Sequence, residues 1–146
     1  MTTGKDVWIR TLKATIGVTA LIVGGLLYVI FRSKSLLMFD WFHMIGLSDM
    51  VENIRTKYDG VNLYGWVKDC MPAGLWLFSY LFVIDSLWGN DRNLVYNLFI
   101  FVLPVIAICS EFMQLFGMLP GTFDYMDLIS YVVAILIFIL IKKLKV

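Results

Sequence analysis

The sequence has 146 residues, of which 60% are hydrophobic and 16% charged, and its mean hydropathy is +0.83. This apolar content lies well above the roughly half-apolar average of soluble domains and argues against a soluble fold. The formal net charge of +1 argues against nucleic-acid binding. We therefore predict a single transmembrane domain over residues 1–146, in which helices pack against one another and against membrane lipids.

Four apolar stretches are long enough to be membrane-spanning helices, since a helix needs about 20 residues to cross roughly 30 Å of hydrocarbon. The first contains Gly17, Gly24 and Gly25, small residues of the kind that let helices approach closely in lipid. It has no small-residue cleavage site before Arg32, so we expect an uncleaved helix and not a signal peptide. The predicted spans are residues 12–31, 71–88, 94–109 and 128–141.

The second and third spans are predicted to form an antiparallel hairpin, because only the short turn 89–93 separates them. Pro72 suits the first turn of the second span, and Trp76 and Trp88 near its ends suit the membrane interface. Pro104 lies inside the third span and is expected to kink it.

The segment 33–69 is too long for a plain connection and too rich in Leu, Met, Phe and Trp for a solvated linker. Within it, residues 36–44 have the pattern of a short amphipathic helix in the membrane interface, or of a partial re-entrant piece. We therefore predict an all-α polytopic fold, a four-helix transmembrane bundle with an interfacial helix between spans 1 and 2.

The distribution of charge predicts the orientation of the chain. Four crossings place both termini and the turn 89–93 on one side, and because these regions are basic, the positive-inside rule makes that side cytoplasmic. Asp85, late in the second span, then lies near the cytoplasmic end, where it can reach Arg92 or Lys13 as an anchor. The opposite face receives most of the acids, namely Asp40, Asp49, Glu52, Asp59, Asp69, Glu111, Asp124 and Asp127.

The main candidate binding residues surround the loop between the last two spans. Glu111 and Gln114 are three residues apart and share one face of a helix end, and Asp124 and Asp127 repeat this spacing at the start of the next helix. Charges at membrane depth are usually paired or functional, and oxygen ligands that converge suit a divalent cation such as Mg²⁺ or Ca²⁺. The simpler interpretation is that Asp124 only caps a helix and Glu111 marks a helix end at the headgroups.

Asp40 and His43 form a second candidate pair, three residues apart on the predicted interfacial helix. His43 is the only histidine, a residue type that titrates near neutral pH, so it is a candidate for proton transfer. The simpler interpretation is that it only contributes to an amphipathic surface. Cys70 and Cys109 have neither CxxC spacing nor a histidine nearby, and are predicted to be inert small apolar residues.

The pattern Glu-x-x-Gln at the end of one apolar helix, followed by Leu-Pro-Gly-Thr-Phe-Asp-x-x-Asp-Leu opening the next, resembles the VanZ-like family of small bacterial membrane proteins. The matching positions are Glu111, Gln114, Asp124 and Asp127. Members of this family also often carry an Asp and a His early in the chain, as Asp40 and His43 do here. The resemblance implies a bacterial cytoplasmic membrane location and a cell-envelope role, with a link to glycopeptide (teicoplanin) resistance, but no established reaction.

The chain departs from the family pattern near the acids. Many members have an Arg just before Asp-x-x-Asp, where this chain has Gly121 and Thr122, and an Asn and a Gly usually follow where it has Tyr131 and Ala134. The acids must therefore be offset by a metal, by a cationic ligand or by another basic residue. The candidates for that residue are Arg32, Lys34 and Arg55.

Three classes of function remain open. The chain binds or modifies an external lipid-linked or cell-wall ligand through the acids, or it is a membrane enzyme that uses a bound metal or His43. Alternatively, it is a non-enzymatic subunit of a larger assembly, or a homo-oligomer that conducts cations. The sequence has no serine nucleophile elbow, Cys–His pair, phosphate loop or HExxH, which favours binding over catalysis without deciding whether the protein is an enzyme.

Overall fold

The computed structural model describes residues 4–89 and 91–143, which form seven helices and no β-strand. Four of these helices are long and apolar enough to cross a membrane: α1 (Gly4–Phe31), α5 (Met71–Trp88), α6 (Leu94–Leu115) and α7 (Tyr125–Lys143). The structure therefore confirms an all-helical fold with four candidate spans. Their arrangement as a closed bundle in a bilayer stays a prediction.

Two helix ends differ from the predicted spans in a way that matters for the site. α6 continues to Leu115 instead of ending at residue 109, and α7 begins at Tyr125 instead of residue 128. The predicted bounds followed hydropathy, but polar side chains do not end a helix when its backbone hydrogen bonds continue. As a result Glu111 and Asp127 lie inside helices.

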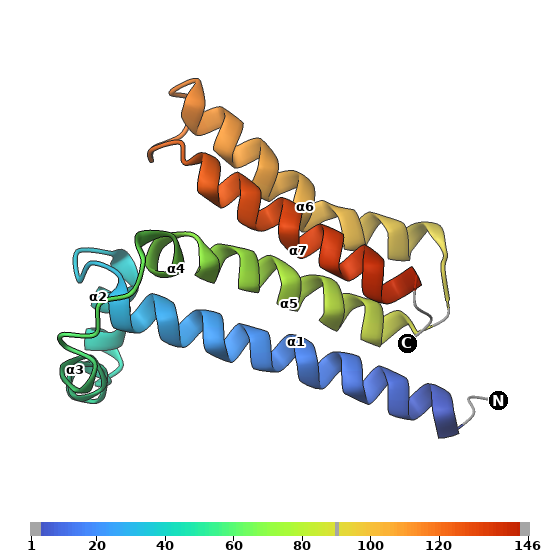
Figure 1. Ribbon diagram of the computed structural model, residues 1–146, viewed down its shortest axis with the longest axis horizontal. Helices are drawn as coiled ribbons and strands as arrows, with labels where there is room; N and C mark the ends of the chain where they lie inside the picture. The colour runs from blue at the N-terminus through green and yellow to red at the C-terminus, as the bar shows by residue number, and fades with distance from the viewer. Residues whose placement is uncertain (1–3, 90, 144–146) are drawn as a thin grey trace.

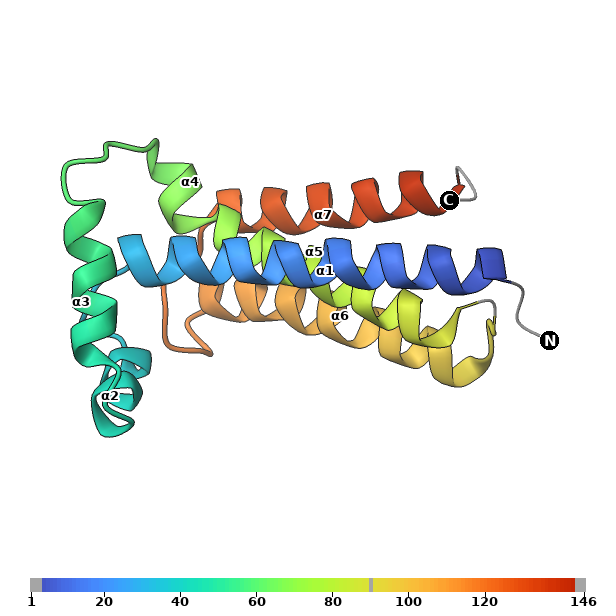
Figure 2. The same cartoon turned by 90° about the horizontal axis from the view of Figure 1, so that it is seen from below.

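α5 is the central helix of the molecule. α1 packs along one side of it, while α6 and α7 lie on the other (Figures 1 and 2). The close approach of α1 depends on small residues, since a Cβ added to Gly17 would lie 2.9 Å from Val83 Cγ2 and 3.0 Å from the carbonyl oxygen of Ser79. The buried apolar core comes from α5, α6 and α7 and consists of Leu77, Leu81, Phe82, Tyr96, Ile100, Ala134 and Phe138.

α6 runs without interruption through Pro104, which is buried. Figure 1 shows that its course bends near the middle. Proline removes one backbone hydrogen bond and clashes with the preceding turn, so the bend agrees with the predicted kink.

The segment between α1 and α5 forms three short helices, α2 (Leu37–Met44), α3 (Ser48–Lys57) and α4 (Gly65–Asp69). α2 matches the predicted helix 36–44, whereas α3 and α4 were not predicted, and the location of α2 in the membrane interface stays a prediction. α3 is attached to α1 by Arg55, whose Nη1 donates to the carbonyl oxygens of Val29 at 2.5 Å and Arg32 at 2.9 Å. Arg55 thus satisfies two of the carbonyl groups that the end of α1 leaves without partners.

The two ends of the molecule differ in charge. We call the end where α1 begins, α5 ends, α6 begins and α7 ends the basic end, and the opposite one the acidic end (Figure 1). At the basic end the described part of the chain has six basic side chains, Lys5, Arg10, Lys13, Arg92, Lys142 and Lys143, and three acidic ones, Asp6, Asp85 and Asp91. That the basic end faces the cytoplasm stays a prediction of the positive-inside rule.

Candidate functional site

Glu111 and Asp124 meet at the junction of α6 and α7, as their spacing predicted. The Glu111 side chain is buried, with 4% of the residue exposed, and its Oε2 accepts a hydrogen bond of 3.4 Å from the backbone N–H of Asp124. Asp124 in turn caps α7, because its Oδ1 accepts from the N–H of Met126 at 2.8 Å. The positive end of the α7 dipole favours both carboxylates at this position.

The Gln114 side chain packs against the loop between the two helices. Gly121 has φ +132°, a backbone conformation that favours glycine, and an added Cβ would lie 2.9 Å from Gln114 Cδ. The Gln114 amide therefore packs directly on the loop that carries the chain to Asp124. Gln114 therefore lies beside the acids and in contact with the loop that precedes Asp124.

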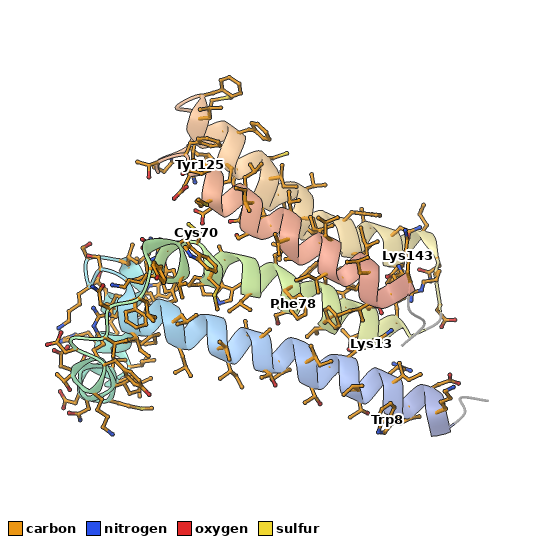
Figure 3. All side chains as sticks on the ribbon, in the orientation of Figure 1. Trp8, Lys13, Cys70, Phe78, Tyr125 and Lys143 are labelled. Carbon is orange, nitrogen blue, oxygen red and sulfur yellow. The ribbon has the colours of Figure 1, made fainter. Side chains whose placement is uncertain are left out.

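Cys70 is the residue at this site that the sequence analysis missed. It lies between α4 and α5, is almost fully buried, and its Sγ donates to Asp124 Oδ2 at 3.6 Å. Figure 3 shows it below the start of α7. The interpretation of Cys70 as an inert apolar residue overlooked this contact. The sequence did indicate where Cys70 lies relative to the membrane. It directly precedes the second span and so shares the acidic end with Asp124 and Asp127.

The Cys70 thiol is a neutral hydrogen-bond donor at physiological pH. Burial raises its pKa to about 12, and the neighbouring carboxylates of Asp127 and Asp124 contribute to the increase. A thiol in this state is a poor nucleophile. The site therefore offers hydrogen bonds and charge more readily than covalent chemistry.

Asp127 and Arg32 each have a buried polar atom without a hydrogen-bond partner among the described residues, Oδ1 in Asp127 and Nε in Arg32. Arg32 binds Asp69 through a hydrogen bond of 2.8 Å to its carbonyl oxygen and an ion pair of 3.6 Å to its carboxylate. It is also close enough for its charge to act on Asp127.

Of the three basic residues considered as partners of the acids, Arg32 is the one whose charge acts on Asp127. Lys34 forms an ion pair of 2.5 Å with Glu52, and Arg55 binds the end of α1.

A metal ion could be held by Cys70, Asp124 and Asp127, since one ligand atom from each lies within 4.8 Å of the other two. A thiolate with two carboxylates suits Zn²⁺, whereas the two carboxylates alone suit Mg²⁺ or Ca²⁺.

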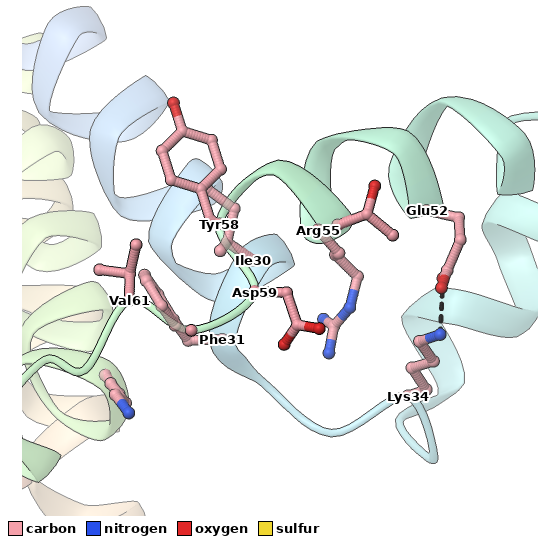
Figure 4. Close-up of a pocket in the computed structure, with 11 residues that line it drawn as sticks. Ile30, Phe31, Lys34, Glu52, Arg55, Tyr58, Asp59 and Val61 are labelled. Atoms are coloured by element: carbon pink, nitrogen blue, oxygen red, sulfur yellow. Dashed lines mark ion pairs between the residues drawn. The ribbon is translucent and has the colours of Figure 1, made fainter.

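Asp40 and His43 are exposed on α2 and belong to another part of the acidic end. They line a pocket of about 250 Å³ between α2 and α3, and a neighbouring groove of about 410 Å³ contains the Lys34–Glu52 ion pair and Arg55 (Figure 4). Glu111 and Asp124, in contrast, meet at the α6–α7 junction.

The α6–α7 junction therefore combines three acids, a neutral thiol and one nearby arginine, and two of these groups have unused hydrogen-bonding capacity. This arrangement can recognise a polar group that carries both donors and acceptors. No protein-family model, curated protein or solved structure matches the chain.

Proposed function

We propose that this chain is a multi-pass protein of the bacterial cell envelope that binds an external lipid-linked cell-wall ligand at the α6–α7 junction. The observation that carries the proposal is the pair of unpartnered buried atoms, Asp127 Oδ1 and Arg32 Nε. Leaving a buried polar group without a partner costs about 1–3 kcal/mol. A ligand that offers a donor to Asp127 and an acceptor to Arg32 removes both costs.

A lipid-linked cell-wall ligand can supply both kinds of group. A lipid-linked cell-wall precursor has phosphate or carboxylate oxygens for Arg32 and hydroxyl, amide or amine groups for Asp127. Its lipid tail can lie along the apolar outer faces of the long helices, where side chains such as Phe112 are exposed. The resemblance of the Glu111, Gln114, Asp124 and Asp127 pattern to VanZ-like proteins supports the same class.

Recognition has more support than catalysis. The Cys70 thiol is neutral, and His43 lies on α2 with α3 residues around it. A homo-oligomer formed through small-residue helix faces also has less support, because Gly17 and Gly24 already pack against α5 within the chain.

The proposal is tested by measuring the thermal stability of the detergent-purified protein with and without a lipid-linked peptidoglycan precursor. The wild type and Asp49→Asn, which removes an exposed acid of α3, are expected to gain stability, while Asp127→Asn is expected to gain much less. An equal response of all three proteins would show that the junction is not the binding site. A parallel titration with Mg²⁺, Ca²⁺ and Zn²⁺ separates binding of the precursor from binding of a cation alone.

A further inference from the structure

A second charged cluster, built around Asp85, lies at the basic end. The Asp85 side chain is only 1% exposed and is fully paired: Lys13 Nζ lies 3.0 Å from Oδ2, and Arg92 Nη1 lies 2.5 Å from Oδ1. Tyr96 OH also donates to Oδ1 at 2.8 Å. The expectation that Asp85 reaches Arg92 or Lys13 is confirmed, and it reaches both.

Lys142 adds a further positive charge to this cluster. Its Nζ donates to Tyr96 OH at 3.0 Å and lies 5.1 Å from the centre of the Tyr96 ring and 5.7 Å from that of Phe138. Lys13 and Arg92 are near enough for their charges to act on it. No carboxylate is within ion-pair distance of Lys142 among the described residues.

The cluster cannot neutralise itself with its own groups. Asp85 already forms ion pairs with two cations. The Tyr96 hydroxyl donates one hydrogen bond to Asp85 and accepts one each from Arg92 and Lys142. It therefore has no free hydrogen-bonding position. Three cations therefore share one buried carboxylate. Arg10 adds a fourth beside them, bound to the carbonyl oxygens of Ser86 at 2.8 Å and Leu87 at 2.7 Å.

This excess of positive charge lies where lipid headgroups are expected. Asp85 is within the last turn of α5, Arg92 lies in the turn before α6, and Lys142 is in the last turn of α7. Helix ends of this kind reach the headgroup region, and Trp88 at the end of α5 suits the same depth. Arg92 remains accessible, with 34% of its side chain exposed.

We propose that Arg92 and Lys142 bind the phosphate of an anionic phospholipid headgroup. Two cations that converge beside a low-dielectric helix interface favour a phosphate, and basic pockets between spans bind anionic headgroups in this manner. The site lies at the opposite end from the acidic junction, so it is independent of the proposed cell-wall ligand.

The test compares lipid binding to the wild type, Lys142→Gln and Lys57→Gln. Lys57→Gln makes the same change of charge at an exposed position in α3, at the acidic end. Each protein is reconstituted in phosphatidylcholine nanodiscs, phosphatidylglycerol is titrated in, and thermal stability is recorded. Native mass spectrometry counts the lipids that remain bound, and inorganic phosphate serves as a separate probe.

The wild type and Lys57→Gln are expected to be stabilised by phosphatidylglycerol, with an apparent affinity about fivefold weaker in Lys142→Gln. High salt should reduce the stabilisation, and inorganic phosphate should not reproduce it. Equal affinity of Lys142→Gln and the wild type would overturn the proposal. An equal effect of millimolar inorganic phosphate would also overturn it, because the cluster would then be a site for free anions and not for a lipid.

Discussion

Asp85 and Asp127 are both carboxylates on long helices, one near each end of the molecule, but their surroundings are opposite. Asp85 has two cations and a tyrosine hydroxyl within bonding distance, whereas Asp127 keeps a buried oxygen without a partner among the described residues. A carboxylate whose bonds are complete holds helices together. One whose bonds are incomplete costs stability unless a ligand completes them. The comparison separates a structural acid from a candidate binding residue.

The largest expected effect is that of Asp85→Asn. This change leaves Lys13 and Arg92 beside a neutral group, and breaking a buried ion pair typically costs about 3–5 kcal/mol. We expect a large drop in the melting temperature of the detergent-purified protein. Asp127→Asn is the matched change at the acidic end and should leave stability unchanged or slightly higher, because it removes a charge with an unpaired oxygen. Equal losses in the two variants would contradict the distinction.

A smaller loss is expected for Gly17→Ala, which perturbs the basic end through helix packing. The new Cβ would lie 2.9 Å from Val83 Cγ2 and 3.0 Å from a backbone oxygen, so α1 must move away from α5 near Lys13. Overpacking of this kind costs about 1–3 kcal/mol, measurable as a lower melting temperature. Gly25→Ala is the control, since nothing lies within 4 Å of its Cβ. Alanine has a higher helix propensity than glycine, so a loss as large in Gly25→Ala would show that crowding against α5 is not the cause.

The third effect, on the reactivity of Cys70, probes the acids directly. In a Cys109→Ser background, where Cys70 is the remaining cysteine, its labelling by a maleimide should still accelerate as the pH rises to 10, because its pKa is raised to about 12. An ordinary cysteine, with a pKa of about 8.5, would have levelled off by then. Adding Asp127→Asn should increase the rate at pH 8, because removing the negative charge favours the thiolate. An unchanged rate would mean that burial alone protects the thiol.

The sequence was sufficient for the features that depend on local spacing and on length. Apolar stretches of about 20 residues identified the four long helices. The convergence of Glu111 and Asp124 was predictable because a short loop joins two helices whose ends must lie on the same side. Asp85 could be assigned to Lys13 and Arg92 because the order of the spans places all three residues near the same end of the molecule.

The features that sequence reasoning missed depend on which helices pack together. Cys70 reaches Asp124 because α5 packs against α7, and Lys142 joins Tyr96 across 46 positions of the chain. Neither contact follows from residue spacing. Arg55 was proposed as a partner of the acids, but the folding of α3 under α1 directs it to backbone carbonyls instead. In each case the sequence shows the type of the residue but not its neighbour in the folded structure.

The smallest expected effect concerns Lys34 and Glu52, an ion pair whose side chains are both more than half exposed. The hydrogen bond from Lys34 lowers the pKa of Glu52 below its ordinary value of 4.5. A carboxyl group with a lowered pKa stabilises the folded state above its unfolded pKa, and this contribution is lost as the pH falls through the folded pKa. Between pH 7 and pH 5.5 the pair should therefore make a constant contribution to the stability of the folded state. That contribution should be small, because water screens an exposed ion pair strongly. We expect Glu52→Gln to have a melting temperature close to that of the wild type throughout this range. A loss comparable to that of Asp85→Asn would mean that exposure does not weaken an ion pair here, and the contrast between buried and exposed charges would have to be abandoned.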